Sequence, residues 1–174
     1  MKPQQPKALK PTLTPLRTAL ADKNLLGTAL QGDSWAGWRA LLLAAMGERL
    51  EPAELDHFKR LTHRSASPDS RVEEAWIVAG RRAGKSRAIA TLITYLACLC
   101  DHTAKLVAGE KGVVVCLAPS QLQASIVLSY ISGILEASPI LKSAAQRGAR
   151  DRSRLRTRRP CRLRARLQPH WAVP

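Results

Sequence analysis

The sequence predicts an α/β fold with a parallel βαβ core, N-terminal helices before it and a disordered basic tail after it. Residues 74–79 and 112–117 are short apolar runs, the second rich in β-branched side chains, as in buried strands. Between them an amphipathic stretch from Lys85 to about Cys100 predicts a helix. A strand, a helix and a strand at this spacing predict a right-handed crossover between parallel strands. Two strands alone make an incomplete sheet.

The remaining elements are expected to be helices. Asp33 or Ser34 can cap a helix that ends near Gly47, and Pro52 suits the first turn of the next one. A last helix is expected after Ser120. The apolar stripes expected to face the core are Ile89, Leu92, Ile93, Leu96 and Leu99 on the central helix, and Leu122, Ile126, Val127, Tyr130, Ile131 and Ile134 on the last.

Charge is distributed unevenly along the chain. Of the net charge of +15, residues 142–174 carry +10, from 11 basic residues and one acidic residue. Such a basic, apolar-poor composition predicts disorder and favours contact with nucleic acid. There is no secretory signal, and no apolar run approaches the roughly 20 residues that span a bilayer. The sequence therefore predicts a cytoplasmic protein without a membrane partner.

One stretch carries recognisable chemistry, the apolar residues 76–79 followed by Gly80-Arg81-Arg82-Ala83-Gly84-Lys85-Ser86. A strand, a Gly-containing loop and Lys-Ser opening a helix form a cradle for nucleotide phosphates. Loop N–H groups face the phosphates, Lys85 reaches the β- and γ-phosphates, and the Ser86 hydroxyl can hold Mg²⁺. Ala79 occupies the first Gly position of the usual pattern, so the match is to a variant loop. The pattern predicts a P-loop NTPase-like fold that binds ATP and Mg²⁺.

Residues 26–141 resemble the N-terminal ATPase region of phage terminase large subunits, the motors that pump DNA into procapsids. Three features carry the resemblance: the loop with Arg87 after it, Gly109-Glu110-Lys111 before the second apolar run, and Ala118-Pro119-Ser120-Gln121 with Gln123-Ala124 after it. Upstream, Trp35-x-x-Trp38-Arg39 and residues 58–62 also look similar to that family.

The resemblance implies specific roles and partners. It makes Arg81 the catalytic arginine that acts on the γ-phosphate. It makes Lys85 a phosphate-binding residue and Ser86 the residue that binds Mg²⁺. The cofactor-binding set is then Gly80, Arg82, Ala83, Gly84, Lys85, Ser86 and Arg87. The implied partners are double-stranded DNA, a terminase small subunit and a portal protein, with homo-oligomers if the chain is intact, all in the host cytoplasm. The predicted organisation is a flexible segment (1–23), a partial P-loop ATPase domain (24–141) and an Arg-rich tail (142–174).

Whether the chain is an enzyme is left open by its carboxylates. Hydrolysis needs an apolar strand that ends in an Asp for Mg²⁺ and a Glu that activates water. The carboxylates after Lys85 do not fit this pattern: Asp101, Glu110, Glu136 and Asp151. The family's acidic strand and its nuclease domain are also expected beyond residue 141. We therefore expect a truncated copy that hydrolyses ATP poorly.

The origin of the Arg-rich tail is open. It is either the product of a frameshift near residues 142–146 or a genuine arm that binds DNA by counterion release.

Two other functions also stay open beside the terminase ATPase. One is a non-enzymatic nucleic-acid-binding protein that acts through the Arg-rich tail. The other is a different phosphate-loop protein, such as a fragment of a helicase-like ATPase.

Overall fold

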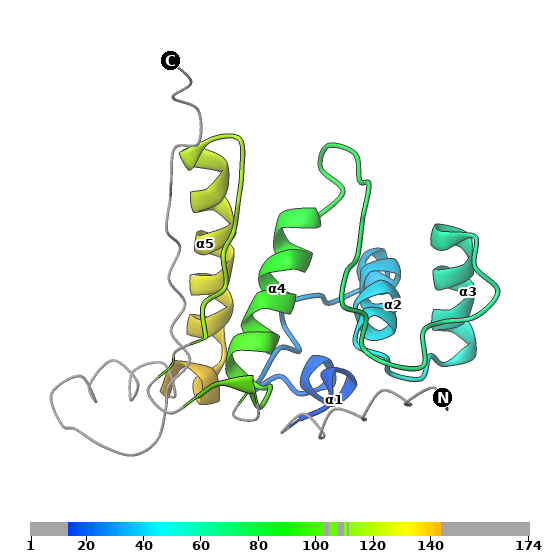
Figure 1. Cartoon of the computed structure of the whole chain (residues 1–174), viewed down its shortest axis with the longest axis horizontal. Coiled ribbons are helices and arrows are strands. Elements are labelled where there is room, and N and C mark those ends of the chain that lie inside the picture. Colours follow the sequence, from blue (N-terminus) through cyan, green and yellow to red (C-terminus); the bar gives the residue numbers. More distant parts are fainter. Residues whose placement is uncertain (1–13, 103–104, 108–109, 111, 144–174) are drawn as a thin grey trace, which may run out of the picture.

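The computed structural model describes residues 14–102, 105–107, 110 and 112–143. In this part of the chain the regular elements are helices (Figure 1). They are α1 (Leu16–Ala21), the short 3₁₀ helix η1 (Asp33–Trp35), α2 (Ala36–Ala45), α3 (Pro52–Thr62), α4 (Lys85–Cys98) and α5 (Gln121–Ala137). Residues 139–143 add one further helical turn. None of these helices has the length and apolar character needed to cross a membrane.

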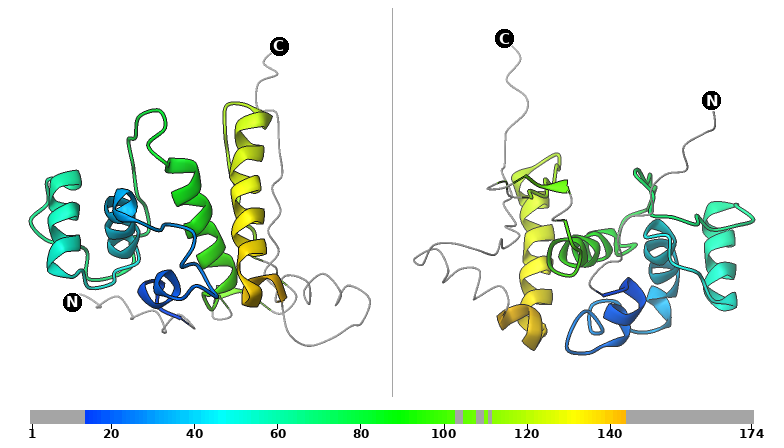
Figure 2. Two further views of the ribbon diagram at one scale, coloured as in Figure 1. Left: turned by 180° about the vertical axis from the view of Figure 1, so that it is seen from behind. Right: turned by 60° about the horizontal axis from the view of Figure 1, so that its bottom comes forward.

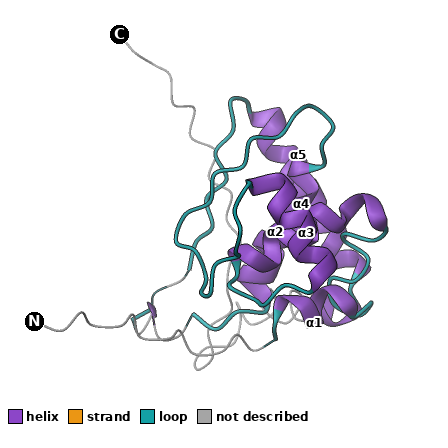
Figure 3. Ribbon diagram, turned by 90° about the vertical axis from the view of Figure 1, so that its right-hand side faces the viewer, coloured by secondary structure: helices purple, strands orange, loops and turns teal. Residues whose placement is uncertain are grey.

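The predicted α/β fold with a parallel βαβ core is wrong. Residues 74–79 and 112–117 are extended but unpaired, and the described residues contain no strand (Figure 3). The two segments flank α4 (Figures 1 and 2), and no backbone hydrogen bond between described residues joins them. Paired strands must lie about 4.8 Å apart. With α4 between them, the two apolar runs cannot form a ladder with each other.

The helix α1 belongs to the body of the molecule. Its side chains Leu16 and Ala19 are fully buried. The Glu48 carboxylate accepts the N–H groups of Leu16 and Arg17, which closes the open start of the helix. The Arg17 guanidinium then bonds both Glu54 oxygens, at 2.8 and 2.6 Å. Part of the segment 1–23, predicted to be flexible, is therefore anchored; residues 1–13 lie outside the described part.

The helices α2 and α3 form an antiparallel pair whose boundaries follow the sequence signals. Gly47 takes φ 71° after α2, the left-handed conformation that glycine adopts without strain. Pro52 opens α3, where Glu51 and Glu54 form a reciprocal capping box. Both predicted helices are present, but neither Asp33 nor Ser34 caps the first one, which begins as η1 and continues as α2 without a side-chain cap. Phe58 carries α3 into the common core.

The helices α4 and α5 pack against each other and complete this core. Their buried apolar side chains include Ile93 and Tyr95 from α4 and Val127, Ile131 and Ile134 from α5. Several side chains expected to face inward do not: Ile89, Leu122, Ile126 and Tyr130 are exposed. The sequence predicts one broad apolar face on each of α4 and α5. Contact between the two helices buries only part of each face, and the described residues contain no sheet that would cover the remaining part.

Candidate functional site

The predicted phosphate loop is a tight turn between the extended residues 74–79 and the start of α4. The Ala83 N–H donates to the Gly80 carbonyl oxygen at 3.4 Å, which closes the turn. Arg82 has φ 60°, and Gly84, the residue that precedes α4, has φ 82° and ψ 4°. Gly84 is the residue type that takes this left-handed conformation at least cost. The local prediction of a loop followed by a helix from Lys85 is therefore confirmed, although an unpaired segment leads into it.

The N-terminus of α4 is open. Gly84 offers no capping side chain, and Ala88 N–H makes the first bond of the helix, to the Gly84 oxygen at 3.0 Å. The N–H groups of Lys85, Ser86 and Arg87 precede that bond and have no intrahelical acceptor. Left-handed Gly84 followed by right-handed Lys85 is the kind of alternation in which successive N–H groups converge on an anion. The helix dipole adds partial positive charge at the same place.

The basic side chains of the loop lie at the surface. Arg81, Arg82 and Lys85 are all exposed. The Lys85 ammonium folds back and donates to the Gly80 oxygen at 3.3 Å, so it lies over the turn rather than away from it. A single neutral carbonyl at that distance is a weak partner for an ammonium, and an anion entering the turn would replace it favourably.

Arg87 points away from the turn. Its guanidinium lies over the Trp35 ring, 5.2 Å from the centroid, and its Nη2 donates to the Thr28 oxygen at 3.0 Å. The structure therefore separates Arg87 from the other predicted cofactor-binding residues. It ties α4 to the segment before η1 instead.

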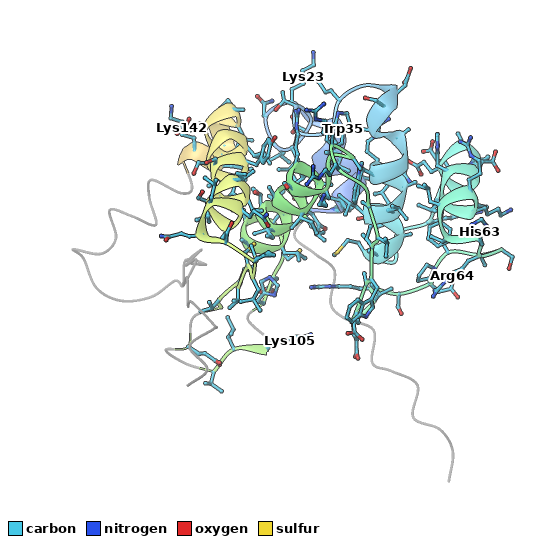
Figure 4. The ribbon with its side chains drawn as sticks, turned by 90° about the horizontal axis from the view of Figure 1, so that it is seen from above. Lys23, Trp35, His63, Arg64, Lys105 and Lys142 are labelled. Carbon is cyan, nitrogen blue, oxygen red and sulfur yellow. The ribbon has the colours of Figure 1, made fainter. Side chains whose placement is uncertain are left out.

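Two tryptophans contact the turn. Trp38 Nε1–H donates to the Ala83 carbonyl oxygen at 2.7 Å. Trp35 lies so close to Gly84 that a Cβ built there would be 2.6 Å from the ring. Figure 4 shows Trp35 beside α4. The sequence places both tryptophans on the helix expected after Asp33 or Ser34, and their spacing of three puts them on one face, but it does not predict their contact with the turn.

The metal part of the site is weaker than the phosphate part. Ser86 is half-buried in the first turn of α4, where its hydroxyl can meet a cation bound to phosphate. Within the described ranges, no group of three or more His, Cys, Asp or Glu residues converges as metal ligands would. The residues present fit the phosphates of a nucleotide, while for Mg²⁺ they supply one hydroxyl.

Comparisons of the chain with protein-family models, with curated proteins and with solved structures found no match. Inference about function therefore rests on the geometry of the turn and on the resemblance of its residues.

Proposed function

We propose that residues 80–86 bind the phosphates of ATP, and that the chain is the ATP-binding part of a DNA-packaging motor of the terminase large-subunit type. The observation that carries the proposal is the open start of α4 with Lys85 folded over it. An N-terminus of this kind is a ready anion site. The fold around the turn is the helical one described above, without the parallel sheet expected from the sequence.

The chemistry of binding follows from the groups at the turn. The N–H groups of Lys85, Ser86 and Arg87 donate to phosphate oxygens, and the Lys85 ammonium exchanges the Gly80 oxygen for the β- or γ-phosphate. Arg81 and Arg82 add two exposed cations within the same short stretch. Together they make a local positive field that attracts a triphosphate. The resemblance assigns Arg81 to the γ-phosphate.

Mg²⁺ binding and hydrolysis need groups other than those that bind the phosphates. The Ser86 hydroxyl would hold Mg²⁺ together with phosphate oxygens, and the bound ion would neutralise phosphate charge. Because the carboxylates after Lys85 do not fit a water-activating pair, we propose ATP binding with slow hydrolysis. DNA, a small subunit and a portal protein are the partners that the resemblance implies, and the host cytoplasm is the compartment it implies. Two of the residues behind it, Gly109 and Lys111, lie outside the described part of the chain.

Calorimetric titration of the full chain with Mg-ATP tests the proposal. Lys85→Ala removes a charge-assisted hydrogen bond, so we expect the Kd to rise about 10- to 100-fold. Lys142→Ala is the matched control, because it removes the same charge from an exposed site near the end of α5 (Figure 4) and should leave the Kd unchanged. An unchanged Kd for Lys85→Ala, or no binding by the wild type, would reject the phosphate site.

Turnover supplies a second measurement on the same samples. We expect steady-state hydrolysis well below about 1 s⁻¹, the low end of ordinary enzyme rates. A turnover at or above that rate would show that the chain contains a water-activating group other than the carboxylates after Lys85.

A further inference from the structure

We propose that Trp38 is a positioning residue for the phosphate loop. In this inference, which rests on the proposed function, the indole N–H holds the Ala83 carbonyl and thereby fixes the direction of the next N–H group in the turn. Trp38 itself touches no phosphate. Its contribution is to keep the turn in one of two peptide orientations.

The contact joins two residues that are far apart in the sequence. Trp38 lies on α2, 45 residues before Ala83, and its Nε1–H donates to the Ala83 oxygen at 2.7 Å. A half-buried indole needs a partner for its polar N–H, and this carbonyl supplies it. This distance lies at the short end of the range for N–H···O hydrogen bonds.

The anchor that carries Trp38 is rigid. Ala40, Leu42 and Leu43 of α2 are at most 2% exposed. Arg39, the neighbour of Trp38, donates to the carbonyl oxygens of Leu30 and Gly32, both at 2.8 Å, which fixes the start of α2 against the preceding loop. An indole on such a helix holds a fixed position.

Because the peptide bond is planar, the contact between Trp38 and the Ala83 carbonyl also fixes the direction of the Gly84 N–H. The Ala83 carbonyl and the Gly84 N–H belong to one trans peptide unit, so they point in opposite directions. With the carbonyl held toward Trp38, the Gly84 N–H must point away from it, where it can donate to a phosphate. Because Gly84 is permissive in φ, the peptide unit can flip when it is not held. The flipped unit would present a carbonyl oxygen, which repels a phosphate.

Trp35 limits the same movement from another side. Its ring lies close to the Gly84 Cα, and its face carries the Arg87 guanidinium at 5.2 Å. Arg87 also donates to the Thr28 oxygen. The first turn of α4 is therefore held by Trp35 at the end of η1, while Ala83 is held by Trp38 on α2, which follows η1 directly, and the two contacts act together on the turn.

Nucleotide affinity of an isosteric variant tests the inference. Replacing Trp38 with benzothienylalanine puts a sulfur in place of the N–H and keeps the ring volume; Trp38→Phe is the simpler second variant. We expect each to raise the Kd for Mg-ATP about three- to tenfold, the worth of one hydrogen bond. Trp76→Phe is the control, because Trp76 is 87% exposed. Thermal unfolding midpoints of the isosteric variant and the control should match.

A spectroscopic measurement separates positioning from a merely structural role. In ¹H–¹⁵N spectra of the wild type, the Trp38 indole N–H should exchange with solvent at least about tenfold more slowly than that of Trp76. The Gly84 amide signal should shift in the Trp38 variants and not in Trp76→Phe.

The outcomes are distinguishable from failure of the proposed function. If the wild type binds Mg-ATP, Lys85→Ala weakens binding and the Trp38 variants bind as the wild type does, the inference is overturned and the phosphate site stands. If the wild type binds no nucleotide, both fail. If the variants weaken binding with unchanged stability and a shifted Gly84 signal, the inference is supported.

Discussion

The helices α4 and α5 start in similar surroundings but differ in whether a side chain caps the first turn. Both α4 and α5 follow an extended apolar segment and a turn. At α5, Ser120 is extended and its hydroxyl accepts the Gln123 N–H at 3.3 Å, so the helix closes its own N-terminus. At α4, Gly84 leaves the N-terminus without a side-chain cap, and the exposed basic residues Arg81, Arg82 and Lys85 lie within the same short stretch of sequence. The comparison teaches that the residue before the helix decides whether its N–H groups are available to a ligand.

The two starts also differ in what holds them. Ser120 closes α5 through a contact three residues away in sequence. The turn before α4 depends on Trp38, which is 45 residues away. A helix start whose N–H groups must stay free for a ligand cannot be stabilised by a side-chain cap. At α4, tryptophans distant in sequence hold the turn in place of a cap. Three predictions test this comparison, beginning with the largest expected effect.

Adding a methyl group at the open start should be severely destabilising. Gly84→Ala forces a left-handed conformation that costs about 1–2 kcal/mol and drives the Cβ into Trp35, so we expect a loss of about 2 kcal/mol or more in unfolding free energy. Gly133→Ala in α5 meets nothing within 4 Å and should stabilise by up to about 1 kcal/mol. Urea unfolding of both variants measures the difference. Equal midpoints would mean that Gly84 does not need its conformation.

Removing the Ser120 hydroxyl should lower stability alone, and removing the Ser86 hydroxyl should weaken nucleotide binding alone. Ser120→Ala removes the cap of α5 and should cost about 1 kcal/mol, with the Kd for Mg-ATP unchanged. Ser86→Ala removes no cap, so we expect a stability change within about 0.5 kcal/mol but weaker binding in the presence of Mg²⁺. Unfolding and calorimetry on the same samples measure both. The opposite pattern would show that Ser86 is the structural residue and Ser120 the functional one.

A third helix start, that of α3, is closed by carboxylates and should respond to pH. Burial raises the pKa of the Glu54 carboxyl, but the hydrogen bonds from Arg17 and from the Glu51 N–H lower it more, so its pKa lies below its ordinary value. A lowered pKa means that the ionised form stabilises the fold above the unfolded-state pKa. That contribution is lost as pH falls through the folded-state pKa.

The measurement is the urea midpoint between neutral pH and about pH 3, compared with Glu54→Gln. The wild type should lose more stability than the variant over this range. The effect should be the smallest of the three, because the Arg17 and Glu54 side chains are 34% and 22% exposed. If the urea midpoints of the two proteins change in parallel with pH, the ionised Glu54 carboxylate does not stabilise the start of α3.

Local signals predicted the helices well because those signals act over a few residues. Pro52, the glycine after α2 and the Ser120 cap all mark boundaries that the structure reproduces to within one or two residues. The same holds for the turn before Lys85, which the sequence predicts as a loop that leads into a helix. The candidate site could be located from sequence for this reason, although its roles in binding ATP and Mg²⁺ remain predictions.

The predicted sheet is wrong because a strand needs a partner, which the sequence pattern of a single segment cannot supply. Residues 112–117 do show strand-like alternation: Val114 and Cys116 face the core, while Val113, Val115 and Leu117 face outward. The exposure of the side chains thus alternates along an extended backbone although the sequence is a continuous apolar run, and no neighbouring strand lies within reach among the described residues. A pattern fixes which side chains share a face; it does not supply the second strand.

The Trp38 contact is the part of the site that no pattern contains. An indole on one helix and a carbonyl 45 residues later meet only after α2 and α4 have packed into their places. The same is true of Arg87, which the motif placed at the phosphates and which the structure places over Trp35. Tertiary packing decided both positions.

The extended residues 112–117 have a consequence for the behaviour of the chain in concentrated solution. They are six uncharged residues without proline, and Leu117 is 83% exposed. Short β-rich segments of this kind stack into cross-β fibrils in which identical strands from many chains pair with one another. Because this segment has no partner strand among the described residues, we expect it to be the first part of the chain to pair with other copies at high concentration.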